Sequence, residues 1–242
     1  MDERELVIHL EDISFAHPGG PRVLDNVCLD LYRGDRIGLM GPNGSGKTTL
    51  FHVIMGLLKP TAGRMEIFRK PVREERDFVK VRGRIGLLFQ DADDQLFSPT
   101  VLEDVVFGPL NLGKSREEAR DIARRTLELL GLSSFEDRIT HKLSGGEKRL
   151  VSLATVLAME PEVLLLDEPT TGLDEPTREK LVEVLSRLDL SYILISHEFD
   201  FLARTTQSIL AMEKGRILRD EEAKIHYHFH KHPLGTVPHE HD

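Results

Sequence analysis

The spacing of apolar residues changes along the chain, and each pattern predicts a different kind of element. Apolar and polar residues alternate within residues 6–10 and 27–31, with a Pro-Gly-Gly-Pro turn between them, which predicts two early strands. From the apolar run at residues 37–40 onward, strand-like runs alternate with helical stretches. This order is typical of an α/β fold, in which helices cover a mostly parallel sheet.

Capping-box spacing marks three helix starts in the middle of the chain. The pairs, in which a serine or threonine precedes a glutamate by three positions, are Thr100 with Glu103, Ser115 with Glu118 and Ser144 with Glu147. They predict a helical insert over roughly residues 91–150. Beyond it, the pattern predicts strands at 163–166 and 192–195, a helix between them at about 176–188, and a hairpin over 208–218.

Composition and charge narrow the class of protein. The chain has 242 residues, 40% apolar and 30% charged, as expected for a globular protein of one or two domains. No apolar stretch approaches the roughly 18–20 residues that cross a bilayer, and the acidic start does not resemble a signal peptide. The lone Cys28 cannot form an internal disulfide, which agrees with a reducing compartment. A net charge of −9 also disfavours nucleic-acid binding.

A glycine-rich loop between a predicted strand and a predicted helix carries the strongest chemical signal. It matches the pattern G-x-x-x-x-G-K-[ST] and comprises Gly41, Pro42, Asn43, Gly44, Ser45, Gly46, Lys47 and Thr48, followed by Thr49. The glycines allow backbone N–H groups to surround an anion, Lys47 adds charge for the outer phosphates, and Thr48 can bind Mg²⁺. The strand–loop–helix order argues against a coincidental turn.

Two acidic residues supply the other half of such a site. Asp167 and Glu168 follow the apolar strand at 163–166, at the end where parallel sheets bind ligands. We expect Asp167 to hold Mg²⁺ through its water shell, and Glu168 to orient and deprotonate an attacking water. Alone, these residues would equally suit the end of a surface strand, but the loop upstream favours catalysis.

Residues 143–147, Leu-Ser-Gly-Gly-Glu, have two interpretations that do not exclude each other. Ser144 and Glu147 can cap a helix over about 147–159. Gly145 and Gly146 can also expose backbone N–H groups to a phosphate at the helix N-terminus. One nucleotide does not need two anion sites in one chain, whereas two chains packed head to tail would use both.

These motifs resemble those of the ATP-binding subunits of ABC transporters, in the expected order from about residue 5 to 220. The correspondence is Walker A at 41–48, the Q-loop at Gln90, the signature at 143–147, Walker B ending at Asp167 and Glu168, the D-loop at Asp174 and the switch histidine at His197. The resemblance implies a P-loop, RecA-like ATPase core with an antiparallel β subdomain and a helical subdomain. Residues 1–220 would form this nucleotide-binding domain, followed by a histidine-rich tail at 221–242.

The resemblance also implies a role for each residue, with ATP and Mg²⁺ as cofactors. The Mg²⁺ set is Thr48, Gln90 and Asp167, and the catalytic set is Lys47, Gln90, Glu168 and His197. The signature residues Ser144, Gly145, Gly146 and Glu147 would contact ATP held by the partner subunit.

Two positions depart from the commonest family pattern. Where an aromatic residue often stacks on adenine, this chain has His17, with Phe15 as the alternative. Glu147 replaces a more frequent glutamine, and its charge would weaken phosphate binding unless it turns back as the capping partner of Ser144.

Residues 89–97 and 107–113 add a narrower resemblance, to ATPases of the energy-coupling-factor type and, within it, to cobalt and nickel uptake ATPases. There, a short helix after the Q-loop glutamine meets helices of the membrane-embedded coupling subunit. The alternative interpretation is a polar surface loop.

The tail carries four alternating histidines, His226, His228, His230 and His232. An extended chain places their imidazoles on one face, which suits Ni²⁺ or Co²⁺, and His239 and His241 could add ligands. The alternatives are a solvated tail without a metal and a segment of engineered origin.

We therefore predict the ATP-hydrolysing subunit of an importer for Co²⁺ or Ni²⁺. A homodimer would bind integral membrane subunits at the cytoplasmic face of the cell membrane, without nucleic acid. Three alternatives stay open: the ATPase of a vitamin uptake system, paired with a different ATPase; a soluble ABC ATPase of DNA repair or chromosome structure; and a metal-binding regulatory or storage protein. The span from Lys47 to Ser144 is too short for the long coiled coil that the repair class needs.

Overall fold

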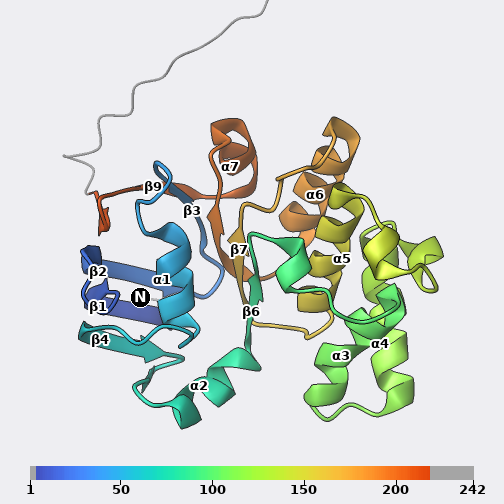
Figure 1. Cartoon of the computed structure of the whole chain (residues 1–242), viewed down its shortest axis with the longest axis horizontal. Helices are drawn as coiled ribbons and strands as arrows, with labels where there is room; N and C mark the ends of the chain where they lie inside the picture. The colour runs from blue at the N-terminus through green and yellow to red at the C-terminus, as the bar shows by residue number, and fades with distance from the viewer. Residues whose placement is uncertain (1–3, 219–242) are drawn as a thin grey trace, which may run out of the picture.

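The structure, a computed structural model, describes residues 4–218, and its strands form two sheets (Figure 1). The strands are β1 (Leu6–Ala16), β2 (Arg22–Tyr32), β3 (Arg36–Met40), β4 (Ala62–Ile67), β5 (Lys70–Pro71), β6 (Ile85–Leu88), β7 (Val163–Asp167), β8 (Ser191–Ile195), β9 (Ser208–Glu213) and β10 (Arg216–Ile217). The larger sheet has the order β10–β9–β3–β8–β7–β6 and is parallel apart from β10. The smaller sheet, β2–β1–β4–β5, is antiparallel.

The helices include all those that the sequence patterns predict. They are α1 (Lys47–Ile54), α2 (Glu75–Arg82), α3 (Val101–Asn111), α4 (Arg116–Leu129), α5 (Gly145–Leu157), α6 (Glu175–Arg187) and α7 (Phe199–Thr205), with the short 3₁₀ helices η1 (Ala92–Asp94), η2 (Ser133–Phe135) and η3 (Thr140–Lys142). The three predicted capping boxes are confirmed at the starts of α3, α4 and α5. Helix α5 begins at Gly145, earlier than predicted, because Ser144 is itself the N-cap.

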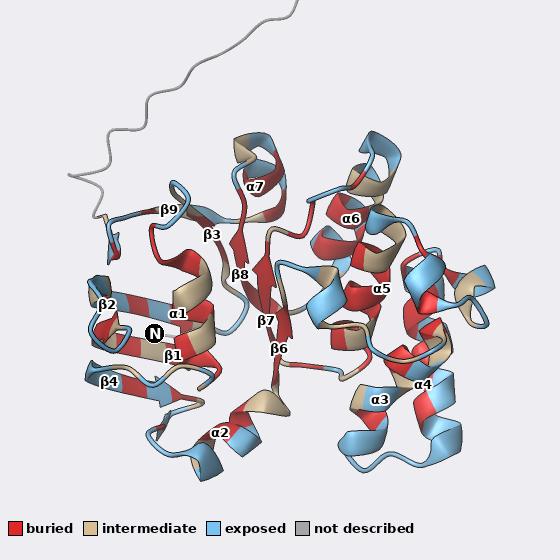
Figure 2. Ribbon diagram, viewed as in Figure 1, coloured by how far each residue is buried: buried red, intermediate tan, exposed pale blue. Residues whose placement is uncertain are grey.

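The core lies on both faces of the larger sheet, so β6, β7 and β8 are buried along their length (Figure 2). On β7, Leu165 faces a cluster formed with α1 and the antiparallel sheet. Its neighbours Leu164 and Leu166 face a second cluster with α3, α4, α5 and α6. This alternation follows from the two-residue period of a strand, and it explains why 163–166 is an unbroken apolar run. The predicted α/β fold class is confirmed.

Two features of residues 4–218 bear on membranes and metals. Within residues 4–218, no helix has the length and apolar character that crossing a membrane requires. The same stretch contains no cluster of three histidine, cysteine or acidic side chains able to hold a metal ion. The four tail histidines predicted to bind metal lie outside the described residues.

Candidate functional site

The glycine-rich loop joins β3 to α1 and packs closely against neighbouring strands. Gly46, the N-cap of α1, has a φ of 106°, and a Cβ there would lie 2.9 Å from the Val23 carbonyl oxygen. A Cβ on Gly41 would lie 2.0 Å from the carbonyl oxygen of Met212. Only glycine fits at these two positions, because the first needs a left-handed backbone and the second a close approach to another chain segment.

The first residues of α1 contact the end of β7. Thr48 Oγ1 donates a hydrogen bond to Asp167 Oδ2 at 2.7 Å. The Lys47 ammonium group is buried and donates to the Gly41 carbonyl at 2.7 Å and to the Pro42 carbonyl at 3.1 Å. Burial lowers the pKa of Lys47 and raises that of Asp167. The site thus holds two opposite charges out of water, each less stable in its charged form than at the surface.

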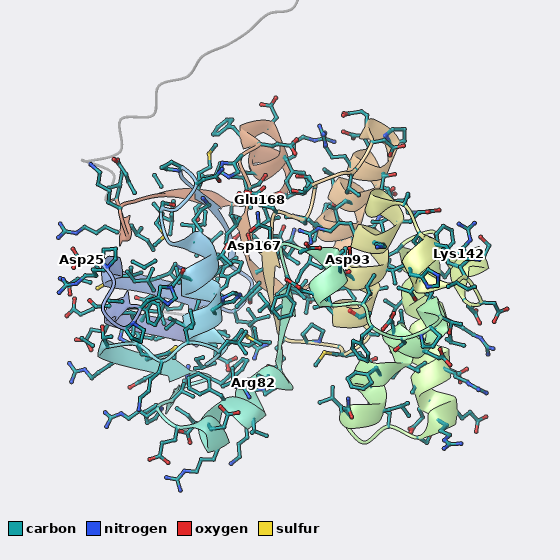
Figure 3. The ribbon with its side chains drawn as sticks, in the orientation of Figure 1. Asp25, Arg82, Asp93, Lys142, Asp167 and Glu168 are labelled. Carbon is teal, nitrogen blue, oxygen red and sulfur yellow. The ribbon has the colours of Figure 1, made fainter. Side chains whose placement is uncertain are left out.

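Glu168 follows Asp167 in a backbone conformation that non-glycine residues rarely adopt. Its φ is 47°, and its N–H donates to the Ile195 carbonyl at 3.0 Å, which fixes the turn after β7 against the end of β8. Glu168 Oε1 lies 3.1 Å from His197 Nε2. Burial raises the pKa of Glu168, as does the charge of Asp167, while His197 opposes the shift. Figure 3 shows Asp167 and Glu168 together at the end of β7.

The predicted loop and catalytic residues meet in one cavity of about 300 Å³. Its lining includes the loop residues 43–49 together with Gln90, Asp167, Glu168 and His197. One atom facing this region, Ser45 Oγ, is buried without a hydrogen-bond partner in the described residues. Unpaired buried polar atoms are rare, so its presence here fits a site that binds a polar ligand. The hydroxyl, carboxylate and ammonium groups also suit a Mg²⁺–phosphate complex.

The signature residues line a different cavity, of about 830 Å³, which they share with Asp174. None of its lining residues also lines the loop cavity. The Glu147 carboxylate turns back and accepts from the Ser144 N–H at 2.8 Å, and it also accepts from Arg138 at 2.8 Å. These contacts, the Ser144 backbone bond above all, lower the pKa of Glu147. Its charge is therefore satisfied within the chain, as the capping interpretation predicts.

The remaining predicted residues have simpler surroundings. Asp174 caps α6, accepting from the Thr177 N–H at 3.1 Å, and its hydrogen bonds to Thr177 lower its pKa. His17 is exposed and lies outside the lining of the loop cavity. Phe15 is 5% exposed within the core, and its ring meets that of His17 in a T-shaped contact at 4.9 Å between ring centres. Phe15 is thus unavailable for stacking on adenine, so the alternative placement of the aromatic contact is wrong.

Arg149, which the motif analysis missed, connects three of the motifs. It lies on α5 and is 3% exposed. Its guanidinium group donates to the carbonyls of Phe89 and Gln90, before and within the Q-loop, and to those of Asp167 and Glu168. Burial lowers its pKa, and the nearby acidic residues oppose that shift. One sequence signal was available: Arg149 is a charged residue at a helical position with apolar neighbours on the same face.

Glu198 was also missed, although it adjoins His197. Its carboxylate accepts from Thr170 Oγ1 at 2.7 Å and lies 3.1 Å from the Arg178 guanidinium on α6. These contacts join the segment carrying His197 to the segment between β7 and α6. No sequence motif marks such a contact, because its members are distant in the chain.

The fold and the loop cavity together define a P-loop ATPase. A family model described as "ABC transporter" matches residues 24–171, and the chain belongs to this family. It is 51% identical to an ABC transporter ATP-binding protein of Nitratidesulfovibrio vulgaris, over 97% of this chain and 86% of that one. It is 40% identical to the energy-coupling factor transporter ATP-binding protein EcfA of Methanothermobacter thermautotrophicus, over 88% of this chain and 70% of that one.

Solved structures show the same likeness. The cbiO1 protein of Clostridium perfringens, part of the ABC transporter complex cbiONQ, is similar with a TM-score of 0.80 and 34% identity, over 89% of this chain and 88% of that one. The ATP-binding cassette MJ0796, a dimer bound to ADP and Pi, is similar with a TM-score of 0.81 and 30% identity, over 88% of this chain and 97% of that one. The chain is an ABC ATPase subunit of a transporter, which uses ATP with Mg²⁺ and couples its hydrolysis to transport.

Proposed function

We propose that two copies of this chain bind head to tail and enclose two ATP molecules between them. The observation that carries the proposal is that, within one chain, the signature residues lie outside the lining of the loop cavity. A head-to-tail pair would bring the loop of each chain opposite the signature of the other. Each chain has both halves, so a homodimer forms two complete sites.

In each site the residues have distinct tasks. The loop N–H groups and Lys47 bind the phosphates, and the N-terminus of α5 beyond Ser144 presents further N–H groups from the partner. Thr48, Asp167 and Gln90 would hold Mg²⁺, which offsets phosphate charge when bound. Glu168 accepts a proton from the attacking water, and burial, which raises the pKa of Glu168, makes it a stronger base for that transfer. His197 holds the Glu168 carboxylate in place.

We further propose that the transporter is of the energy-coupling-factor type. The likeness to EcfA and cbiO1 supports this, as does an exposed apolar patch near the Q-loop. The patch consists of Phe97, Phe107, Leu110 and Leu112, which are 66%, 48%, 40% and 42% exposed. The two phenylalanine rings meet edge to face at 4.8 Å. Exposed apolar patches of this kind mark interaction sites.

The occupant we propose for this patch is a helix of an integral membrane subunit, with apolar and basic side chains. The charge supports that choice, because Asp91, Asp93 and Asp94 lie in the turn just before Phe97 and are exposed. Such binding would hold the chain at the cytoplasmic face of the membrane.

The double change Phe97→Ser and Phe107→Ser tests the docking. Co-expressed membrane subunits should no longer co-purify, while the ATPase activity of the isolated chain stays unchanged. Val79→Ser is a matched control, because Val79 is 62% exposed on α2 and lies outside the patch. Unchanged co-purification with both serines present would contradict the proposed surface.

For the transported substrate we propose Co²⁺ or Ni²⁺, on the resemblance of residues 89–113 to cobalt and nickel uptake ATPases and on the alternating tail histidines. Uptake of labelled metal by the purified complex tests this, and uptake of a vitamin instead would support the alternative substrate. Calorimetry with Ni²⁺ on the full chain and on a chain truncated after Glu222 tests the tail separately. Equal heats from both would show that the tail holds no metal.

A further inference from the structure

The amide side chain of Gln95, the C-cap of η1, attaches the Q-loop turn to α5. Its Oε1 accepts from the Phe89 N–H at 3.2 Å, which closes the turn onto the end of β6. Its Nε2 donates to the Ser152 carbonyl at 2.9 Å and to Thr155 Oγ1 at 2.8 Å, both on α5. One side chain thus uses its acceptor and both of its donors to join the turn to the helix.

Two more contacts join the same elements. Lys148 Nζ lies 2.5 Å from Asp93 Oδ1, and Arg149 donates to the Phe89 and Gln90 carbonyls. The contact residues on α5 are Lys148, Arg149, Ser152 and Thr155, whose spacing places them along one side of the helix. Helix α5 begins directly after Ser144. The turn that contains Gln90 and the helix that Ser144 caps are therefore joined along two helical turns.

Among these contacts, those of Gln95 are the partly buried ones that link only the turn and α5. Asp93 is 69% exposed, so its ion pair with Lys148 is weakened by solvent. Arg149 also contacts the carbonyls after β7, so changing it would disturb the catalytic strand as well. Gln95 contacts neither the glycine-rich loop nor β7, and is partly buried.

We infer that Gln95 is a positioning residue, which holds Gln90 and Ser144 in a fixed relative position. The inference rests on the proposed function in one respect: there, Gln90 serves the ATP of its own chain and Ser144 that of the partner. Gln95 then links the two ATP sites of the dimer, so a displacement of the turn at one site moves the signature at the other. The exposed patch beside it, at Phe97, makes this turn the place where a docked subunit would act.

The test uses the full chain, measured for ATP turnover and amide exchange. Gln95→Leu keeps the bulk of the side chain and removes all three hydrogen bonds. We expect kcat to fall about tenfold, with KM for ATP within about twofold, since a small misplacement of catalytic groups costs turnover while the nucleotide loop is untouched. The Phe89 amide should exchange faster with solvent, because it loses its acceptor.

Two further variants separate positioning from a general loss of structure. Gln95→Glu keeps the acceptor for the Phe89 N–H but loses the donors to α5, so kcat should fall as in Gln95→Leu while Phe89 exchange stays slow. Thr155→Val removes one partner on α5, and combining it with Gln95→Leu should lower kcat no further. Gln207→Leu is the matched control: it removes a side-chain bond to the Arg36 N–H at the start of β3, and kcat should be unchanged.

Three outcomes would overturn the inference. They are a wild-type kcat in Gln95→Leu, additive losses in the double variant, and a loss of activity that matches a loss of folded protein in the thermal melt. Since none of these measurements involves a membrane subunit or a transported substrate, failure of the transport proposal leaves the result intact. A failed Gln95 test likewise leaves docking and uptake to be judged on their own experiments.

Discussion

The loop half of the site and the signature half are built in opposite ways. In the loop half, Asp167 and Lys47 are buried, and burial shifts each pKa against the charged form. In the signature half, the Glu147 carboxylate is hydrogen-bonded by Ser144 and paired with Arg138, so its pKa is lowered and its charge is satisfied.

This difference shows which half needs a ligand. The loop half contains a buried hydroxyl without a partner among the described residues, Ser45 Oγ, and two buried charges, Lys47 and Asp167, that a Mg²⁺–phosphate complex would satisfy. In the signature half the Glu147 charge is already satisfied within the chain, and the start of α5 offers backbone N–H groups. We therefore expect the loop half to bind nucleotide first, and the signature half to close on it from a second chain.

Glu168→Gln should have the largest effect on this arrangement. Hydrolysis should fall by about 10²–10⁴-fold, the usual loss with a general base, while ATP still binds. The ATP-bound dimer should then persist, since the nucleotide joins the two halves. Steady-state turnover and sedimentation at saturating ATP measure both effects. A monomer under those conditions would contradict the shared site, and near-normal turnover would contradict the role of Glu168.

Complementation separates the two halves directly. Lys47→Ala disables the loop half, and Ser144→Asp keeps a good N-cap for α5 while placing a negative charge against the phosphate. Each variant alone should lose about 10²-fold in turnover, as expected when a group stabilising phosphate charge is removed. Mixed in equal amounts, they should recover up to about a quarter of wild-type activity, because half of the dimers contain one intact site.

The control for complementation is a mixture of Lys47→Ala with Glu168→Gln. Both changes damage the loop half, so every mixed dimer lacks an intact site and no activity should return. Recovery in this control, or none in the first mixture, would show that the two halves do not meet across a dimer.

The loop half could be predicted from the sequence because its functional residues stand in two short, continuous motifs. Residues 41–48 and the pair Asp167–Glu168 each follow a strand, and a parallel sheet brings such strand ends together. The contacts of Arg149 and Gln95 could not be predicted, since their partners are backbone carbonyls and N–H groups of distant segments. Helix α2 was missed for a local reason: its N-cap is Glu74, a residue type not among the preferred caps.

His17→Tyr should have a moderate effect confined to the loop half. A larger ring at this exposed position should tighten ATP binding by up to about tenfold, within the range of one aromatic contact. The limiting turnover rate should stay nearly unchanged, because adenine is remote from the bond that breaks. Equilibrium binding and kcat measure the two effects. If His17→Tyr and His17→Ala both bind ATP like the wild type, the adenine does not contact this residue.

The smallest expected effects are on the stability of the protein, and they compare one aspartate from each half. Burial raises the pKa of Asp167 in the folded protein above its pKa in the unfolded chain, which is about 3.9. Ionising Asp167 therefore destabilises the folded state, and this cost develops as pH rises from the unfolded pKa through the folded pKa. Asp167→Asn should therefore raise the melting temperature at pH 7, and the gain should shrink as pH falls. The same variant should lose most of the stabilisation that Mg²⁺ and ATP give the wild type.

Asp174→Asn should show the opposite sign. Hydrogen bonds to Thr177 lower the pKa of Asp174, so its contribution is present at neutral pH and is lost as pH falls through the folded value. Asp174→Asn should thus lower the melting temperature slightly at pH 7, because asparagine also caps helices, and the difference should vanish in acid. Calorimetry from pH 4 to pH 8 measures the melting temperature of both variants against the wild type. If Asp167→Asn melts lower than the wild type at pH 7, burial of that carboxylate carries no cost, and the contrast between the two halves fails.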